Sequence, residues 1–320
     1  MSDETLIQVE HLYRDYGNLH ALADINLTLK RGEVLGFLGP NGAGKSTTMQ
    51  IISGNLAPTS GRVRINGFDI LDEPRQAKAA LGFLPEHPPL YHELTVNEYL
   101  EYCAQLNRIA KPYINDTVKK ACERCGLVDV RKRLIGNLSK GYQQRVGIAQ
   151  AIIHNPEVVI LDEPTVGLDP IQIIEIRDLI KELGSDHSVI LSTHILPEVQ
   201  STCDRVMIIN QGRIALEDSL AGLESRLKSN LVTVSLVNPP DLKTIGALSG
   251  IKELEQLTNN QFQLRVNDDF DPADFARSAV NNNWQLTELT PKTSSLEQVF
   301  IDITCNDNHL NGSQTETAAQ

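Results

Sequence analysis

A nine-residue stretch, GPNGAGKST at 39–47, constrains the fold of this chain more than any other feature. It follows an apolar run that predicts a buried strand over 33–38, and it leads into KSTTMQIISGN, which predicts a helix. Small residues between a strand and a helix let backbone N–H groups turn inward around phosphate oxygens. The helix adds the positive end of its dipole. The stretch therefore predicts a phosphate-binding loop in an α/β fold.

Each residue of this loop is a candidate nucleotide ligand. Lys45 would reach the terminal phosphates, and Ser46 would place its hydroxyl on Mg²⁺. The full candidate set is Gly39, Pro40, Asn41, Gly42, Ala43, Gly44, Lys45, Ser46 and Thr47.

Two further buried strands are predicted, in EVVILDEPT over 157–161 and in SVILSTH over 188–192. Both end in polar side chains, at the edge where open parallel sheets bind ligands. Asp162 would hold Mg²⁺ through water, and Glu163 would polarise the attacking water. His194 would hydrogen-bond the γ-phosphate or that water, although a lone histidine is more often structural.

A second turn before a helix, LSKGYQQR at 138–145, raises the question of why one chain would need two phosphate cradles. It contains a single glycine and lies about ninety residues beyond the first loop.

Composition excludes several classes of protein. The net charge of −12 disfavours general binding to nucleic acid, which requires clustered Lys and Arg. The five cysteines are an odd, scattered set, which argues against a disulfide framework. Cys122 and Cys125 have metal-ligand spacing without a second pair, so one face of a helix explains them better than a metal. No apolar run approaches a membrane span, and the start, MSDETLIQ, predicts no secretion signal.

Patterning also indicates how the chain is organised. LIQVEHLYRDY and HALADINLTLKRGEVLGFLG alternate apolar and polar residues, which predicts antiparallel strands that feed the buried strand 33–38, and GRVRINGFDI predicts a hairpin turning at Asn66-Gly67. Residues 93–125 are rich in predicted helix, interrupted by Pro112. The continuous Val/Ile/Leu strands with helices between them predict a parallel sheet covered on both faces.

Beyond residue 218 the composition changes: 14 acidic against 7 basic residues lie in 218–320. We expect strand 231–237, helix 240–248, strands 251–257 and 261–267, helix 272–281, strand 284–289 and helix 294–304. This order predicts a small ferredoxin-like α+β domain at 218–305. Residues 306–320 have little to bury and are expected to be disordered.

Taken together, the motifs resemble those of the ATP-binding cassette (ABC) ATPases over 1–217, in the family's order and spacing. The resemblance implies an α/β P-loop domain that has a parallel core sheet, an antiparallel β subdomain and a helical subdomain at about 88–150. It also implies ATP and Mg²⁺ as cofactors and ATP hydrolysis as the activity. Tyr16 in RDYGNLHAL would stack on adenine, although an ordinary strand tyrosine is the alternative.

The same resemblance answers the question of the second turn. In this family two copies pair head to tail, and each signature turn caps the ATP held by the other copy. By that analogy Ser139 and Gly141 contact the partner's nucleotide, and Asp169 in GLDP crosses the same seam.

Three positions depart from the family's pattern: Lys140 stands for Gly, Tyr142 for Gln, and Glu86 for the glutamine of its loop. Glu86 can still offer an oxygen to Mg²⁺ or water, but it adds negative charge beside ATP. Weaker nucleotide affinity or slower hydrolysis would follow.

LGFLPEHPPLYHELTVNEYL and SSLEQVFIDIT resemble the ATPase subunits of ABC-2-type exporters, including gliding-motility and multidrug-efflux types. This implies a homodimer at the inner face of the cell membrane, driving a permease that is a separate chain and docks on the surface after Glu86. A soluble ABC ATPase acting on nucleic acid or ribosomes is the alternative, disfavoured by the acidic charge and the lack of a second cassette. A kinase or GTPase would leave the signature motifs unexplained.

Overall fold

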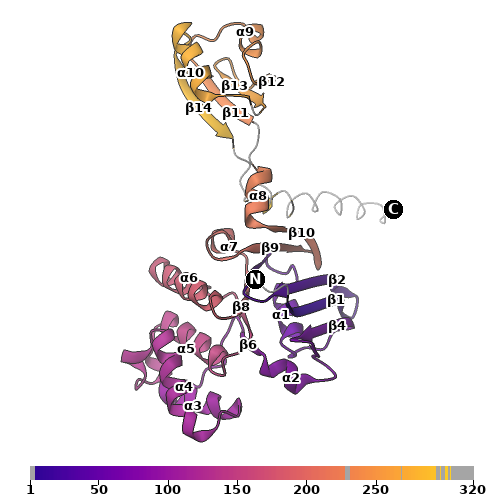
Figure 1. The fold of residues 1–320 in the computed structure, drawn as a ribbon, viewed down its shortest axis with the longest axis vertical. Helices are drawn as coiled ribbons and strands as arrows, with labels where there is room; N and C mark the ends of the chain where they lie inside the picture. Colours follow the sequence, from indigo (N-terminus) through magenta and orange to yellow (C-terminus); the bar gives the residue numbers. More distant parts are fainter. Residues whose placement is uncertain are drawn as a thin grey trace, which may run out of the picture. The chain divides into compact units, whose positions relative to one another are not determined.

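The structure is a computed structural model that describes residues 4–227, 231–267 and 269–292, together with residues 296, 300, 301 and 303. These residues belong to two compact units (Figure 1). Unit 1 extends to Leu220 and includes Ile303, and unit 2 comprises Ala221–Asp302. In the described part of the chain, no helix has both the length and the apolarity needed to cross a bilayer.

A six-stranded sheet forms the centre of unit 1, in the order β10-β9-β3-β8-β7-β6. All neighbours pair in parallel except β10, which is antiparallel to β9. The strands expected at 33–38, 157–161 and 188–192 are β3, β7 and β8; β3 and β8 differ from the expectation by one residue at one end, and β7 is shifted by one residue at both ends. The sheet comprises β3 (Val34–Leu38), β6 (Leu81–Leu84), β7 (Val158–Asp162), β8 (Ser188–Thr193), β9 (Arg205–Asn210) and β10 (Arg213–Ser219).

Successive residues of the central strands enter different hydrophobic cores, because side chains alternate between the two faces of a sheet. On β7, Val158 and Ile160 pack in one core, whereas Val159 and Leu161 pack in the other. The first core includes the buried side of α1 (Lys45–Ile52). The second includes α5 (Lys140–Ile152) and α6 (Pro170–Gly184). The predicted sheet with both faces covered is therefore confirmed.

A second sheet, of order β2-β1-β4-β5, is the expected antiparallel subdomain. Asn66 and Gly67 join β4 to β5 with positive φ angles of 50° and 83°. This conformation suits a tight hairpin turn, and Asn-Gly tolerates it well. The sheet comprises β1 (Thr5–Tyr16), β2 (Leu19–Lys30), β4 (Ser60–Ile65) and β5 (Phe68–Asp69).

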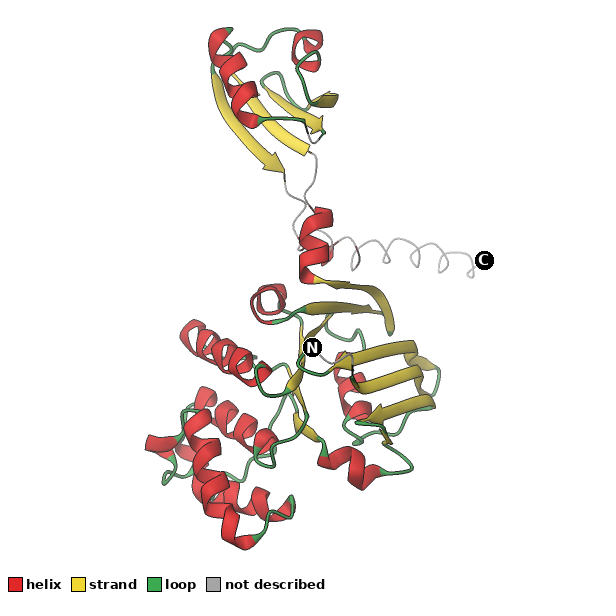
Figure 2. Cartoon of the chain, in the orientation of Figure 1, coloured by secondary structure: helices red, strands yellow, loops and turns green. Residues whose placement is uncertain are grey.

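The chain between β6 and β7 is helical and forms the expected helical subdomain (Figure 2). Pro112 does not interrupt a helix there. It lies in the first turn of α4, where its missing N–H costs no hydrogen bond. The elements are α3 (Val96–Leu106), α4 (Lys111–Arg124) and the 3₁₀ turns Val128–Val130 and Ile135–Asn137, preceded by α2 (Pro74–Ala79) before β6.

Unit 2 has a four-stranded antiparallel sheet of order β12-β13-β11-β14, entered from α8 (Leu220–Leu227). Its core contains Phe262, Phe275 and Trp284. Strand, helix, two strands, helix, strand is the order expected, whereas most of the expected helix 294–304 and the tail 306–320 lie outside the described residues. The elements are β11 (Leu231–Leu236), α9 (Leu242–Gly246), β12 (Ile251–Gln256), β13 (Gln261–Val266), α10 (Pro272–Asn281) and β14 (Leu286–Lys292).

Candidate functional site

The loop at 39–44 connects β3 to the N-terminus of α1. Gly44 caps the helix with φ of 108°, and a Cβ there would lie 2.7 Å from Leu22 Cδ2, so this position requires glycine. The first turn of α1 contains no acidic side chain. The first N–H groups of a helix have no acceptor within the helix, and here they and the positive end of the helix dipole face the loop, which is the arrangement that binds phosphate.

Lys45 is folded back over this loop. Its Nζ donates to the carbonyl oxygens of Gly39, at 2.8 Å, and Pro40, at 3.2 Å, and the side chain is 5% exposed. Its Nζ also lies 3.3 Å from Glu163 Oε1. The buried cation is thus held where it can exchange carbonyl contacts for phosphate oxygens.

Asp162 ends β7, and Ser192 Oγ of β8 donates to its Oδ1 at 2.7 Å. Burial raises the pKa of Asp162, and hydrogen bonds from Ser192 and Ser46 partly offset this rise. The nearby charges of Glu163 and Glu86 raise it further. The structure thus brings Ser46 and Asp162 into contact, as their expected roles require.

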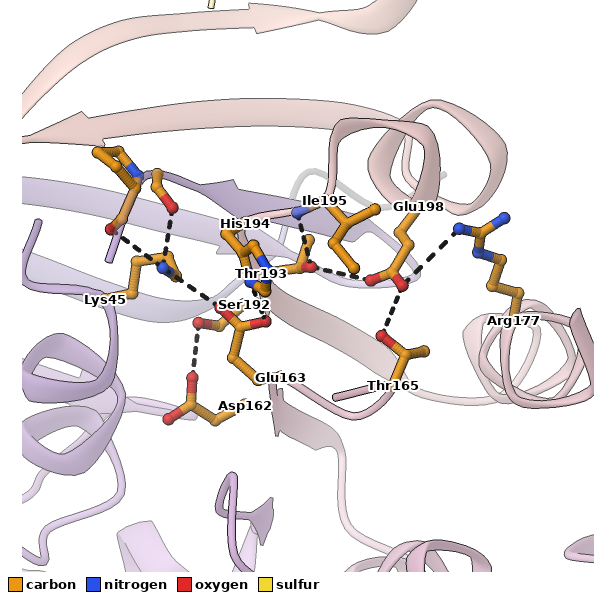
Figure 3. Close-up of polar contacts among 12 residues, drawn as sticks. Lys45, Asp162, Glu163, Thr165, Arg177, Ser192, Thr193, His194, Ile195 and Glu198 are labelled. Atoms are coloured by element: carbon orange, nitrogen blue, oxygen red, sulfur yellow. Dashed lines mark hydrogen bonds and ion pairs between the residues drawn. The ribbon is translucent and has the colours of Figure 1, made fainter. Parts of the chain in front are cut away.

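Glu163 and His194 form the third part of the site (Figure 3). His194 Nδ1 lies 2.8 Å from Glu163 Oε2, while Glu163 Oε1 faces Lys45. The two side chains follow neighbouring parallel strands, β7 and β8, whose carboxyl ends lie at one edge of the sheet. The three predicted elements therefore converge at that edge.

An open cleft of about 900 Å³ lies over this edge. Tyr16 is half exposed at one side, and Arg14 Cζ lies 4.5 Å from the centre of its ring. Such a ring can stack on a purine on its other face. The cleft is lined by most of the candidate residues: Tyr16, Asn41, Gly42, Gly44, Lys45, Ser46, Thr47, Glu86, Glu163 and His194.

Ser139, Gly141 and Asp169 lie instead in a second cleft of about 410 Å³, which shares no lining residue with the first. Ser139 caps α5, and its Oγ accepts from the Tyr142 N–H at 3.5 Å. Asp169 caps α6 through Oδ1, which accepts from the N–H groups of Ile171 and Gln172. Both helix N-termini thus open on the second cleft.

The first cleft fits a nucleoside triphosphate and a divalent cation. Three carboxylates, Asp162, Glu163 and Glu86, approach one another there with Lys45 as the nearby cation. Among the described residues, no group of three or more His, Cys, Asp or Glu side chains is placed to hold a metal ion by itself. Mg²⁺ does not require one, because it keeps several waters and takes phosphate oxygens as further ligands.

Several contacts at the site were not anticipated from the sequence. Ser192 orients Asp162, Arg14 covers one face of Tyr16, and Glu198 binds the residues beside Glu163 and His194. The only sequence signal was polar residues Ser192 and Thr193 at the end of an otherwise apolar strand.

Comparison with known proteins agrees with this geometry. Residues 22–166 match the family model described as ABC transporter. The chain is 36% identical over 311 residues to the ABC transporter ATP-binding protein YdbJ of Bacillus subtilis, covering 94% of this chain and 96% of that protein. It is 32% identical to the linearmycin resistance ATP-binding protein LnrL of B. subtilis, covering 93% and 98% of the two chains.

A solved structure has the same cassette fold. It is the dimeric post-hydrolysis state of the ATP-binding cassette MJ0796 bound to ADP and Pi, with a TM-score of 0.61 and 25% identity. The match covers 67% of this chain and 99% of that one. The phosphate loop, the acid pair and these relatives lead to one assignment: the chain belongs to the ABC transporter family, as an ATP-binding subunit that hydrolyses ATP.

Proposed function

We propose that this ATPase is the motor subunit of an ABC-2-type exporter, which sandwiches two ATP molecules between two copies of the chain and drives a separate permease. The observation that carries the proposal is the division of the machinery between two clefts without a shared residue. A second copy placed head to tail brings each signature cleft over the other copy's phosphate loop.

In each composite site, Lys45 exchanges its carbonyl contacts for the β- and γ-phosphate oxygens. Glu163 accepts a hydrogen bond from the attacking water and polarises it, and His194 orients that water or the γ-phosphate. Ser46 and Asp162 would hold Mg²⁺, with Glu86 near Asp162. When bound, Mg²⁺ neutralises the charge that develops on the phosphate oxygens.

Ser139 and Gly141 of the second copy complete the cage around the γ-phosphate, and Asp169 approaches across the seam. The Lys140 amine lies against Gly167 of the loop before Asp169. The unusual lysine therefore contributes a cation beside this seam.

A third cleft, of about 560 Å³, offers a docking surface for the permease in the region expected after Glu86. Tyr91, Tyr102 and Leu106 line it and are 40% to 63% exposed. We propose that cytoplasmic helices of the permease fill this aromatic groove and hold the ATPase at the inner face of the membrane. A resistance protein among the relatives, LnrL, supports export as the direction of transport.

Mixing two inactive variants tests the shared site. Lys45→Ala disables the phosphate loop, and Ser139→Arg places a bulky cation where the γ-phosphate is capped. Each homodimer should be inactive. In a mixed head-to-tail dimer, one site collects both defects and the other is intact. Random exchange makes about half of the dimers mixed, so activity should return to about a quarter of wild type if the sites fire independently.

Subunit exchange and ATP capping at a single site should be measured in parallel, because strict coupling between sites can suppress turnover. Mixed dimers that form but recover neither capping nor hydrolysis would show that Ser139 does not act on the partner's nucleotide.

A further inference from the structure

A buried carboxylate lies beside the catalytic cluster without lining the nucleotide cleft (Figure 3). Glu198 stands in the first turn of α7 (Leu196–Thr202), and its side chain is 1% exposed. Its Oε1 accepts a hydrogen bond from Thr165 Oγ1 at 2.5 Å and lies 3.7 Å from Arg177 Nη2. Its Oε2 accepts from Thr193 Oγ1 at 2.8 Å. Every oxygen of this buried charge therefore has a partner.

The partners of Glu198 come from three segments that supply the site. Thr165 lies two residues after Glu163, and Thr193 immediately precedes His194. Arg177 lies on α6, the helix that Asp169 caps. Because an unpaired buried carboxylate is costly, these segments are held at the spacing that satisfies Glu198.

The spacing of these segments fixes the contact between His194 Nδ1 and Glu163 Oε2, which lie 2.8 Å apart. Glu163 N–H donates to the Ser192 carbonyl, so a backbone hydrogen bond already joins the two loops. Glu198 adds a second connection, through the side-chain hydroxyls of Thr165 and Thr193. Neither threonine lines the nucleotide cleft.

We propose that Glu198 is a positioning residue for hydrolysis. It holds the loops after β7 and β8 at the separation at which His194 meets Glu163, and Arg177 extends this bracing to α6, the helix that Asp169 caps. The proposal rests on the roles of Glu163 and His194 given above, and its tests separate its failure from theirs.

Thr193→Val tests the bracing with a change that keeps the shape of the side chain. It replaces the hydroxyl by a methyl group, which leaves Glu198 Oε2 without its donor and the Ile195 N–H without its acceptor 3.1 Å away, so the double-mutant cycle below, which changes Glu198 itself, is read beside it. Misplacing a catalytic group by about 1 Å can cost about 100-fold in rate, so we expect kcat to fall by roughly 10- to 100-fold. The affinity for ATP should stay within about twofold, because Lys45 and the loop at 39–44 are untouched. Thr193→Ser restores the donor and should restore most of kcat.

A matched control separates positioning from stability. Glu33 is a partly buried, ion-paired carboxylate, with a 13% exposed side chain and Arg205 Nε at 2.6 Å from its Oε1. It lies at the amino end of β3, at the edge of the sheet opposite the phosphate loop. Glu33→Gln should lower the melting temperature about as much as Glu198→Gln while leaving kcat unchanged.

A double-mutant cycle tests whether Glu198 acts through His194. Turnover should be measured in the full-length chain as wild type, Glu198→Gln, His194→Ala and the double variant, with single-turnover assays for the slow ones. If Glu198 only positions His194, its substitution should add little once the imidazole is gone. Equal fold-losses in both backgrounds, or a wild-type kcat for both Thr193→Val and Glu198→Gln, would overturn the proposal. Wild-type turnover in Glu163→Gln and His194→Ala would instead overturn the assigned site.

Discussion

Glu163 adopts a left-handed backbone conformation, with φ of 49°, directly after the last residue of β7. For a residue other than glycine this conformation costs on the order of 1–2 kcal/mol. In this conformation the Glu163 side chain contacts Lys45, at the start of α1, and His194, which follows β8. Glu163 is one of nine described non-glycine residues with a positive φ, and it is the one that we propose polarises water; strain of this kind is tolerated at functional sites as well as in turns.

Glu163→Gln should therefore bind ATP normally and hydrolyse it at least about 100-fold more slowly. The amide keeps the size of the side chain but is a much weaker acceptor for a proton. ATP-bound dimers should accumulate, because hydrolysis opens the seam, and size-exclusion chromatography with ATP would detect them. Turnover at the wild-type rate would show that another group polarises the water.

At the scale of elements, two histidines fasten helix ends to the amino edge of the central sheet. His154, just after α5, has Nε2 at 3.1 Å from the Leu81 carbonyl oxygen of β6. His187, just before β8, has Nδ1 at 2.7 Å from the Pro156 carbonyl oxygen. Burial lowers the pKa of both below the ordinary value of about 6.5, and the backbone hydrogen bonds only partly oppose this.

A loss of stability in mild acid follows from these two pKa values. A histidine with a lowered pKa in the folded state binds protons more readily in the unfolded chain, so its contribution is present above pH ~6.5 and is lost as pH falls below that value. The melting temperature should drop between about pH 7.5 and 5.5, by roughly 2–4 °C for each kcal/mol lost.

The pair His154→Gln and His187→Asn should flatten this dependence, because both amides can donate to the same carbonyls and neither titrates. Thermal unfolding of both proteins over this pH range provides the comparison, in which carboxylate effects are common to both. An identical slope for the two proteins would exclude the histidines as its source.

At the scale of the whole molecule, ATP turnover and transport should be separable. Tyr102→Ala with Leu106→Ala removes exposed apolar groups from the 560 Å³ groove, far in the chain from the phosphate loop. Basal ATP hydrolysis should persist, while co-purification with the membrane protein encoded by a neighbouring gene and coupled transport should fall at least about tenfold.

Tyr113→Ala is the matched control, since Tyr113 is 67% exposed on α4 and does not line this groove. Unchanged co-purification for the double variant would place the permease elsewhere. We predict that unit 2, Ala221–Asp302, serves dimer contacts or regulation.

Local patterns predicted most elements correctly, because periodicity reports burial directly. Helix Pro272–Asn281 was expected with the same bounds, and strands β11, β12 and β13 each end one residue early. The prediction that Pro112 interrupts the helical region was wrong, because a proline can either end one helix or lie in the first turn of the next. Only the surrounding packing distinguishes these two positions.

The sequence by itself determined that Lys45, Glu163 and His194 meet, because each follows a buried parallel strand and such strands end at one edge of a sheet. Tertiary structure alone decided the contacts made by Glu198, whose partners lie up to 33 residues away in the chain. It also decided that Ser139 lines a different cleft from Lys45. The positions of the strands follow from local patterns of burial, whereas these contacts depend on how helices pack on the sheet, and no local pattern encodes that packing.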